Sequence, residues 1–209
     1  MTQRLSTGPA DSDRVLVLAH GAGAPMDSPW MDAMAALLGD RGIRVVRFEF
    51  AYMAARRDGT RRPAPRAEAV LDEYREVVRQ LREETDATVF IGGKSFGGRV
   101  ASLVADELHI AGGIRGLVCL GYPFHPIGKP EQLRTAHLTE LATPTLVCQG
   151  ERDIMGGRDE VAGYALSPAI RIAWAPDGDH DLKPRKTSGR TLEDNLAAAA
   201  DAVAGHVGG

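Results

Sequence analysis

The sequence feature that most constrains the fold is a serine between glycines, in the segment Gly93-Lys94-Ser95-Phe96-Gly97. The apolar run 89–91 precedes it, as expected of a buried strand, and apolar residues at helical spacing follow from Val100. Flanking glycines leave room for a sharp turn from strand to helix. Such a turn exposes the serine hydroxyl at the amino end of a helix, where free N–H groups favour negative charge. The pattern predicts a nucleophilic serine; the alternative is a serine that only caps the helix.

Short apolar runs alternate with segments of helical pattern along most of the chain. The runs that we expect to be strands span residues 14–19, 43–50, 89–91, 114–120, 145–149 and 170–174. Segments with helical spacing of apolar residues span 28–38, 67–84, 100–108, 159–165 and 191–204. This alternation predicts an α/β fold, in which a mostly parallel sheet of about six strands carries helices on both faces. We expect a flexible tail over residues 1–13 and a single domain over residues 14–209.

Composition and charge exclude several classes of protein. The chain has 209 residues, 44% of them apolar, and a formal net charge of −3, so we expect no nucleic-acid partner. It has no apolar run long enough to span a bilayer and no apolar segment near its start, so we expect a cytoplasmic protein without membrane partners. Cys119 and Cys148 each lie in an apolar run, which predicts buried reduced thiols. No metal-binding motif of cysteine or histidine occurs, and we expect neither a metal nor a cofactor.

Three residues with complementary chemistry follow predicted strands in the order Ser95, Asp153, His180. Because the carboxyl ends of parallel strands meet at one edge of a sheet, we expect their side chains to meet there. A serine hydroxyl is a poor nucleophile until a base takes its proton, and an imidazole titrates near neutrality. Asp153 would orient the imidazole of His180 and stabilise its charged form. The three residues therefore predict a catalytic triad.

A second glycine-rich turn, residues 20–25, follows the first predicted strand. A dinucleotide-binding loop needs a third glycine where Met26 stands, so this turn is not typical of nucleotide binding. Its backbone N–H groups could instead point at a reacting carbonyl group. We expect an oxyanion hole formed by the N–H groups of Phe96 and Ala22, with Gly23 as the alternative to Ala22.

Other residues compete for the roles of acid and base. Asp177, Asp179 and Asp181 flank His180, but they are too close to it in sequence to reach the far nitrogen of its imidazole easily. His125 lies between prolines in a loop at the same predicted edge and is the alternative base. We therefore favour Asp153 as the acid and keep the alternatives open.

Basic residues near the same edge have two interpretations. Lys94 and Ser95 resemble the end of a phosphate-binding loop, but that loop needs a glycine where Thr88 stands. The segment 56–66 carries five arginines and two prolines, and it predicts either a solvated loop or an anion-attracting flap near the site. The basic residues in 183–186 are likewise either solvated or available to an acidic substrate.

Over nearly its whole length the chain resembles the α/β-hydrolase superfamily, and most closely a small, capless, dienelactone-hydrolase-like branch. The segments that carry the resemblance are 20–23, 93–98, 149–153, 166–170 and 177–186. The resemblance implies an α/β-hydrolase fold without a cap domain, and the order serine, acid, histidine is that of the superfamily's triad. Some eukaryotic relatives are subunits of chromatin complexes rather than enzymes, so the resemblance supports the fold more than the activity.

The substrate pocket is expected to be shallow, because the loops are short. From their places in those loops we expect its walls to include Tyr52, Tyr122, Phe124, His125 and Met155. The predicted function is a serine hydrolase that cleaves an ester, thioester or related acyl bond of a small molecule. The alternative is a non-catalytic binding or scaffold protein on the same fold. The sequence indicates no oligomeric state.

Overall fold

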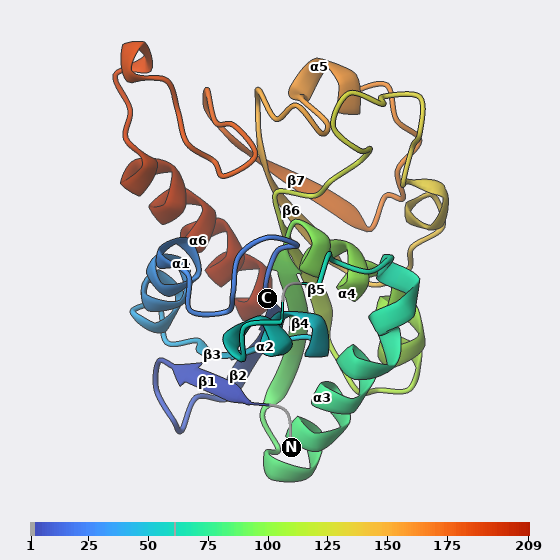
Figure 1. Ribbon diagram of the computed structural model, residues 1–209. Helices are drawn as coiled ribbons and strands as arrows, with labels where there is room; N and C mark the ends of the chain where they lie inside the picture. Colours follow the sequence, from blue (N-terminus) through green and yellow to red (C-terminus); the bar gives the residue numbers. More distant parts are fainter. Residues whose placement is uncertain (1–2, 61) are drawn as a thin grey trace.

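Seven strands form one sheet in the computed structural model, which describes residues 3–60 and 62–209 (Figure 1). Their order across the sheet is β1-β3-β2-β4-β5-β6-β7. All neighbouring strands pair in parallel except β1, which is antiparallel to β3. The strands are β1 (Arg4–Thr7), β2 (Arg14–Ala19), β3 (Arg44–Phe48), β4 (Thr88–Lys94), β5 (Gly116–Leu120), β6 (Thr145–Gly150) and β7 (Ile170–Ala175). The expected α/β architecture is confirmed.

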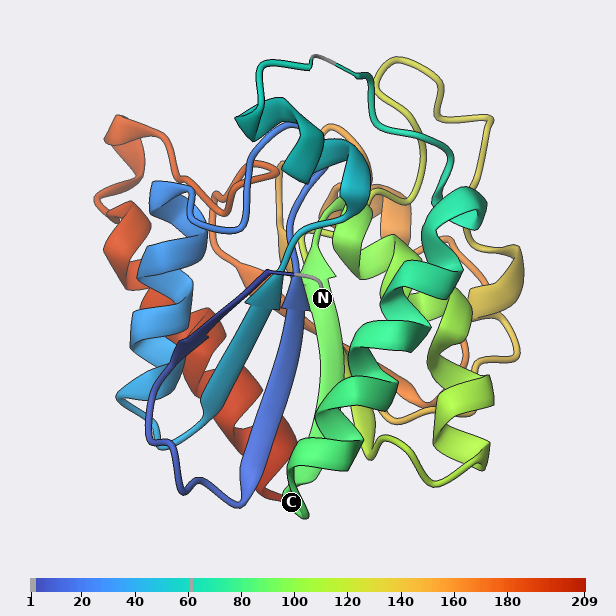
Figure 2. The ribbon, with the colours of Figure 1, turned by 60° about the horizontal axis from the view of Figure 1, so that its bottom comes forward.

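Helices cover both faces of the sheet (Figure 2). The pair α1 (Pro29–Gly39) and α6 (Leu192–Gly208) packs on one face, and the pair α3 (Leu71–Glu84) and α4 (Phe96–Ile110) packs on the other. Shorter helical segments lie in the connections: α2 (Ala51–Arg57), η1 (Ala67–Val70), η2 (Ala136–Leu138), α5 (Arg158–Val161) and η3 (Lys186–Ser188). In the part of the chain that the structure describes, no cap domain is inserted between these elements.

The alternation of side chains along each strand divides the core in two. In β2, Val15 and Val17 contribute to the apolar cluster under α3 and α4, whereas Leu16 and Leu18 contribute to the cluster under α1 and α6. Both clusters are fully buried, as expected for a parallel sheet with two covered faces. The core therefore fixes the positions of the strands, and the loops at their carboxyl ends start from these fixed positions.

Two expectations about local structure were wrong. The segment 1–13 was expected to be a flexible tail, but Arg4–Thr7 forms strand β1, with Leu5 opposite Arg47 of β3. An edge strand of four residues with a single apolar side chain carries almost no periodicity from which it could be predicted. The segment 56–66 was expected to be a loop or flap, but its first two residues are the end of helix α2 (Ala51–Arg57). Residues 1–2 and Arg61 lie outside the described residues.

The two cysteines lie on opposite faces of the sheet, Cys119 in one apolar cluster and Cys148 in the other. Both are buried and unpaired, which confirms the expectation of reduced thiols. Burial raises the pKa of the Cys148 thiol to about 12, so the reactive thiolate is scarce at neutral pH. Among the described residues, no helix combines the length and apolar character needed to cross a membrane.

Candidate active site

Ser95 stands at the junction between β4 and α4, in a backbone conformation that few residues other than glycine adopt. Its φ is 50° and its ψ is −112°. Gly93 and Gly97 make this turn possible, because a Cβ on Gly93 would lie 2.3 Å from the carbonyl carbon of Gly97. A Cβ on Gly97 would lie 2.6 Å from the carbonyl oxygen of Ala19 in β2. The strained turn therefore depends on both glycines, and it presents the serine at the edge of the sheet.

The structure brings Ser95, His180 and Asp153 together. His180 Nε2 is 2.7 Å from Ser95 Oγ, and His180 Nδ1 is 2.7 Å from Asp153 Oδ2. A carboxylate can only accept, so Nδ1 carries a proton in this arrangement and the serine hydroxyl donates to Nε2. The carboxylate side chain is fully buried, whereas the imidazole is 24% exposed. The histidine can therefore reach a bound molecule, and the acid behind it cannot.

Backbone and amide donors fix the carboxylate of Asp153. Its Oδ1 accepts a 2.8 Å bond from the N–H of Met155, and its Oδ2 accepts a 2.9 Å bond from Gln149 Nε2. Gln149, at the end of β6, is fully buried and also bonds both backbone polar groups of Tyr122. The amide thus connects the loop after β5 to the acid. The sequence analysis assigned Gln149 no role of its own. Its polar amide at the end of a buried apolar strand was a signal, because a buried amide needs hydrogen-bond partners.

Lys94, the residue before the serine, holds the histidine loop. Its Nζ donates a 2.8 Å bond to the carbonyl oxygen of His180 and lies 3.1 Å from Asp181 Oδ1. It also lies 5.4 Å from the centre of the Trp30 ring. Burial lowers the pKa of this lysine, and the charge of Asp181 opposes that shift. The sequence argued against a phosphate-binding role for Lys94, but it did not predict this contact with the His180 loop.

The alternative acids have other partners. Asp177 pairs with Arg152 and Arg185, and its backbone N–H donates to Glu151. Asp179 accepts bonds from backbone N–H groups of its own loop. Asp181 pairs with Lys94, as described above. Asp153 is therefore the acid that contacts the imidazole, as the sequence predicted.

The alternative base, His125, is 3% exposed, and its ring contacts other residues than Ser95. Its Nδ1 bonds the carbonyl oxygen of Pro126, and its Nε2 is 3.0 Å from Glu160 Oε1. His20 is fully buried and holds its own turn: Nε2 accepts from the N–H of Phe50, and Nδ1 bonds the carbonyl oxygen of Gly21. Neither ring is free to act on a substrate.

The expected oxyanion donors lie beside the serine. Phe96 is the first residue of α4, where a backbone N–H has no acceptor within the helix. Ala22 lines the same two cavities as Ser95. The hydroxyl group of Tyr52 bonds the carbonyl oxygens of Gly21 and Ala22 at 3.4 and 3.2 Å, which turns the N–H side of that segment away from the tyrosine. The oxyanion hole of Phe96 and Ala22 stays a prediction.

Two cavities flank Ser95. One, of about 440 Å³, is lined by Ser95, Phe96 and three arginines, Arg66, Arg99 and Arg134, among others. The other, of about 460 Å³, is lined by Ser95, His180, Lys94, Trp30 and Met31, among others. Ala22, Ile127 and Met155 border both. The serine thus sits at the boundary between a basic cavity and a largely apolar one.

Four of the five expected wall residues were wrong, among them Tyr52, which is 8% exposed and lines neither cavity. Met155 lines both cavities, but Tyr122, Phe124 and His125 are at most 3% exposed and line neither. The rings of Tyr122 and Phe124 pack on each other in the core, 4.9 Å apart. Their loop was placed correctly, but its apolar rings turn inward because burial of their area is favourable. The prolines of the same loop, Pro123 and Pro126, line the basic cavity instead.

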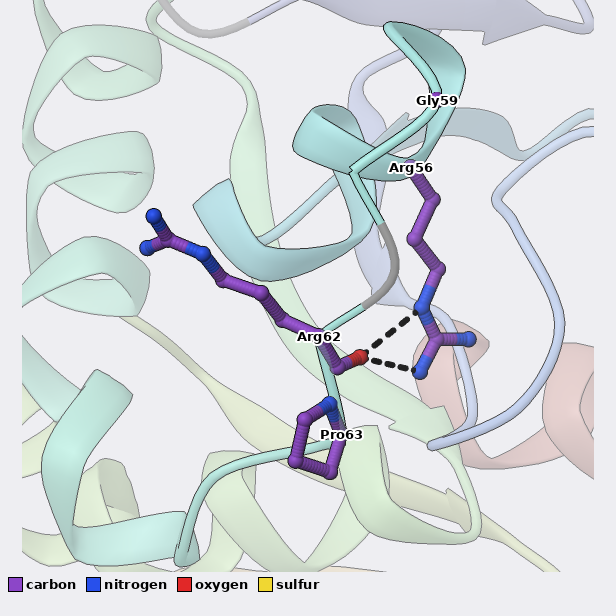
Figure 3. A pocket seen from close by; sticks show the side chains of 4 residues that line it. All are labelled: Arg56, Gly59, Arg62 and Pro63. Carbon is purple, nitrogen blue, oxygen red and sulfur yellow. Dashed lines mark hydrogen bonds between the residues drawn. The ribbon is translucent and has the colours of Figure 1, made fainter.

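The first two arginines of the segment 56–66, Arg56 and Arg57, make contacts with other groups of the protein. Arg57 pairs with Glu49 and Asp27. Arg56 donates to the carbonyl oxygen of Arg62 from Nε and Nη2, at 3.1 and 2.8 Å, across a surface pocket that Gly59 and Pro63 complete (Figure 3). The side chain of Arg62 points away from this contact (Figure 3). This pocket does not contain any residue of the triad.

No group of three or more histidine, cysteine or acidic side chains could hold a metal ion in residues 3–60 and 62–209. The donor set at Ser95 is one hydroxyl, one imidazole and one carboxylate that is already hydrogen-bonded. These groups can relay a proton without help from a metal.

Comparisons with known proteins agree with this fold. A family model described as an alpha/beta hydrolase domain matches residues 12–208. A serine hydrolase without a lid from Xanthomonas campestris has a TM-score of 0.74 at 21% identity, over 99% of this chain and 89% of that one. A dienelactone hydrolase from Anabaena variabilis gives 0.71 at 20% identity, over 97% and 88%. An esterase domain from Rhodothermus marinus gives 0.67 at 16% identity, over 96% and 89%.

Proposed function

The chain belongs to the alpha/beta hydrolase family, and we propose that it is a serine hydrolase that cleaves an ester or thioester of a small molecule. One observation carries the proposal: the continuous hydrogen-bonded relay from Ser95 through His180 to Asp153, with 2.7 Å at each step. The imidazole is partly exposed and lines the largely apolar cavity beside Ser95, which supports a catalytic role for the relay.

In the first half of the proposed reaction, Ser95 Oγ attacks the carbonyl carbon while His180 Nε2 takes the hydroxyl proton. Asp153 stabilises the imidazolium that forms, through the bond to Nδ1. The N–H groups of Phe96 and Ala22 would bind the developing oxyanion. His180 then returns the proton to the leaving oxygen or sulfur, and the acyl group remains on Ser95. These steps use only groups that the chain supplies.

In the second half, a water molecule takes the place of the departed alcohol or thiol. His180 Nε2 accepts a proton from the water as it attacks the acyl carbon, and the same proton returns to Ser95 Oγ as the acyl–oxygen bond breaks. The products are a free acid and the restored relay. The fixed carboxylate of Asp153 lets the imidazole keep one tautomer through both halves.

Hydrolysis of p-nitrophenyl acetate tests the proposal. We expect turnover by the wild-type chain that is abolished in Ser95→Ala and His180→Ala. Asp153→Asn should lower kcat by roughly 10³- to 10⁴-fold, because an amide at this position favours the wrong imidazole tautomer. Circular dichroism and thermal unfolding serve as controls for folding of each variant. A folded wild-type chain without turnover, or with turnover unchanged by Ser95→Ala, would favour a non-catalytic binding or scaffold role.

A further inference from the structure

The basic cavity beside Ser95 has an unusual concentration of positive charge. Arg66, Arg99 and Arg134 line it, and none of the other described residues that line it is acidic. The three arginines come from different parts of the chain, before η1, in α4, and in the loop after β5. Their convergence on one cavity is therefore a product of the fold and not of a local run of basic residues.

Arg99 is only partly neutralised. Its Nη2 donates a 2.7 Å bond to Glu68 Oε1, whereas its Nε is buried and has no hydrogen-bond partner in the structure. The guanidinium side chain is 18% exposed, while that of Glu68 is 55% exposed. An exposed partner compensates a half-buried charge weakly. Arg99 therefore contributes to the cavity a positive charge that Glu68 neutralises only in part.

Two hydrogen bonds fix the backbone of Arg134, whose side chain lines the same cavity as Arg99. Its N–H donates to the carbonyl oxygen of Phe124 at 2.7 Å, and its carbonyl oxygen accepts from the Tyr122 hydroxyl at 3.1 Å. Burial and the charge of Arg99 both lower the pKa of Arg134. Two like charges held close together cost free energy in the empty cavity, and a bound anion would recover it. Guanidinium groups are well suited to a carboxylate, which accepts two parallel hydrogen bonds.

The cavity on the other side of the serine differs in charge. Its lysine, Lys94, is already paired with Asp181, and its walls include the ring of Trp30. His180 lines this cavity and not the basic one. Since the leaving oxygen must receive its proton from His180 Nε2, the alcohol portion of an ester belongs on this side. The acyl portion is then directed into the basic cavity.

We propose that the acyl portion of the substrate carries a carboxylate that Arg99 and Arg134 bind, while the alcohol portion is uncharged and packs against Trp30. This assignment rests on the proposed hydrolase function and names its substrate class: monoesters of dicarboxylic acids. Arg66, exposed at the mouth of the cavity, adds a third charge that attracts such an anion.

Matched esters test the acyl assignment. The mono-p-nitrophenyl ester of adipic acid and p-nitrophenyl hexanoate differ only in a carboxylate or a methyl group at the chain end. We expect kcat/KM to favour the adipate ester by about tenfold or more, the effect of one charge-assisted hydrogen bond. This ratio should fall in Arg134→Gln and Arg99→Gln, and Arg134→Lys should retain part of it.

Arg115→Gln is the control for net charge. Arg115 precedes β5 at the opposite edge of the sheet and is exposed, so this variant should keep the wild-type ratio. The acetate ester of p-hydroxybenzoate, compared with that of p-cresol, places the charge on the alcohol instead. We expect no preference for the charged alcohol. Hydrolysis of hexanoate without a preference for adipate, or a preference that survives both arginine changes, overturns the acyl assignment and leaves the hydrolase function standing.

Direct binding separates failure of this proposal from failure of the hydrolase proposal. Monomethyl adipate should bind to Ser95→Ala in a calorimetric titration more tightly than methyl hexanoate, and addition of Arg134→Gln should weaken that binding. This result is expected even if no ester is turned over. Equal affinity for the two ligands, or affinity unchanged by Arg134→Gln, would show that the basic cavity does not select a carboxylate.

Discussion

At the scale of single residues, Lys94 connects the segments that carry Ser95 and His180, and the proposed chemistry needs these two side chains to stay close together. The residue precedes Ser95 on one side and bonds the carbonyl oxygen of His180 on the other. It is 6% exposed, which is unusual for a lysine, because lysines are rarely buried without a partner. Here the partners are Asp181 and that carbonyl oxygen. The lysine therefore positions the histidine relative to the serine.

Replacement of Lys94 by methionine keeps the apolar stem but removes the ammonium group. We expect Lys94→Met to lower the free energy of unfolding by about 1–3 kcal/mol, because the carbonyl oxygen of His180 loses its buried donor. Turnover should fall as well, since the loop that carries His180 loses its attachment to the strand-to-helix turn at residues 93–97, the elbow. Chemical denaturation and kcat measure the two effects. Lys183→Met, at an exposed position of the same loop, is the control; equal effects of the two changes would contradict the positioning role.

At the scale of elements, the elbow is a close crossing of β4, α4 and β2. Gly97 lies so near β2 that a Cβ would meet the carbonyl oxygens of Ala19 and His20, both at 2.6 Å. The contact is with backbone, which cannot rotate away as a side chain can. The position of α4, and with it the N–H of Phe96, is therefore tied to the turn that contains Ala22.

Gly97→Ala should force α4 away from β2. We expect it to lower the free energy of unfolding by several kcal/mol or to prevent folding, as substitutions that create backbone clashes do. Gly205→Ala is the matched control within α6, where a Cβ would meet nothing within 4 Å. That change should raise the free energy of unfolding by about 0.5–1 kcal/mol, because alanine is the better helix former. Similar stabilities of the two variants in urea denaturation would contradict the close crossing.

The sequence predicted those parts of the fold and the site that local patterns encode. Buried parallel strands are continuous apolar runs, and the elbow needs glycines at set positions, so β4, Ser95 and the order of the relay could be found. The short edge strand β1 and helix α2 have weak patterns and form through tertiary contacts. The same limit applies to Tyr122 and Phe124: loop position is visible in a sequence, but whether a ring turns to the core or to a cavity is decided by packing. Arg66 lies in the segment for which the sequence predicted a solvated loop or an anion-attracting flap, but its convergence with Arg99 and Arg134 could not be predicted because the three are far apart in the chain.

At the scale of the whole molecule, burial keeps several histidines away from water. Burial lowers the pKa of His20, His137 and His206 below their ordinary value of 6.5. In the folded chain they remain neutral at a pH where the unfolded chain already binds protons. The unfolded state therefore binds more protons below about pH 6.5, and acid shifts the equilibrium toward it.

The free energy of unfolding should accordingly fall as the pH is lowered from about 7 to about 5. Each of these histidines contributes a slope of up to about 1.4 kcal/mol per pH unit below about pH 6.5, and the slope vanishes above that pH, where the ring is neutral in both the folded and the unfolded state. Urea denaturation at several pH values measures the slope, and His206→Gln should make it shallower. Stability that is constant or that increases toward pH 5 would contradict the account.

The most direct test of the central claim, that Ser95 is an activated nucleophile, is covalent labelling with a fluorophosphonate probe followed by peptide mass spectrometry. We expect labelling at Ser95 with a stoichiometry near one probe per chain, abolished in Ser95→Ala and strongly slowed in His180→Ala. A folded wild-type chain that remains unlabelled, or a label that falls on another residue, would contradict the claim.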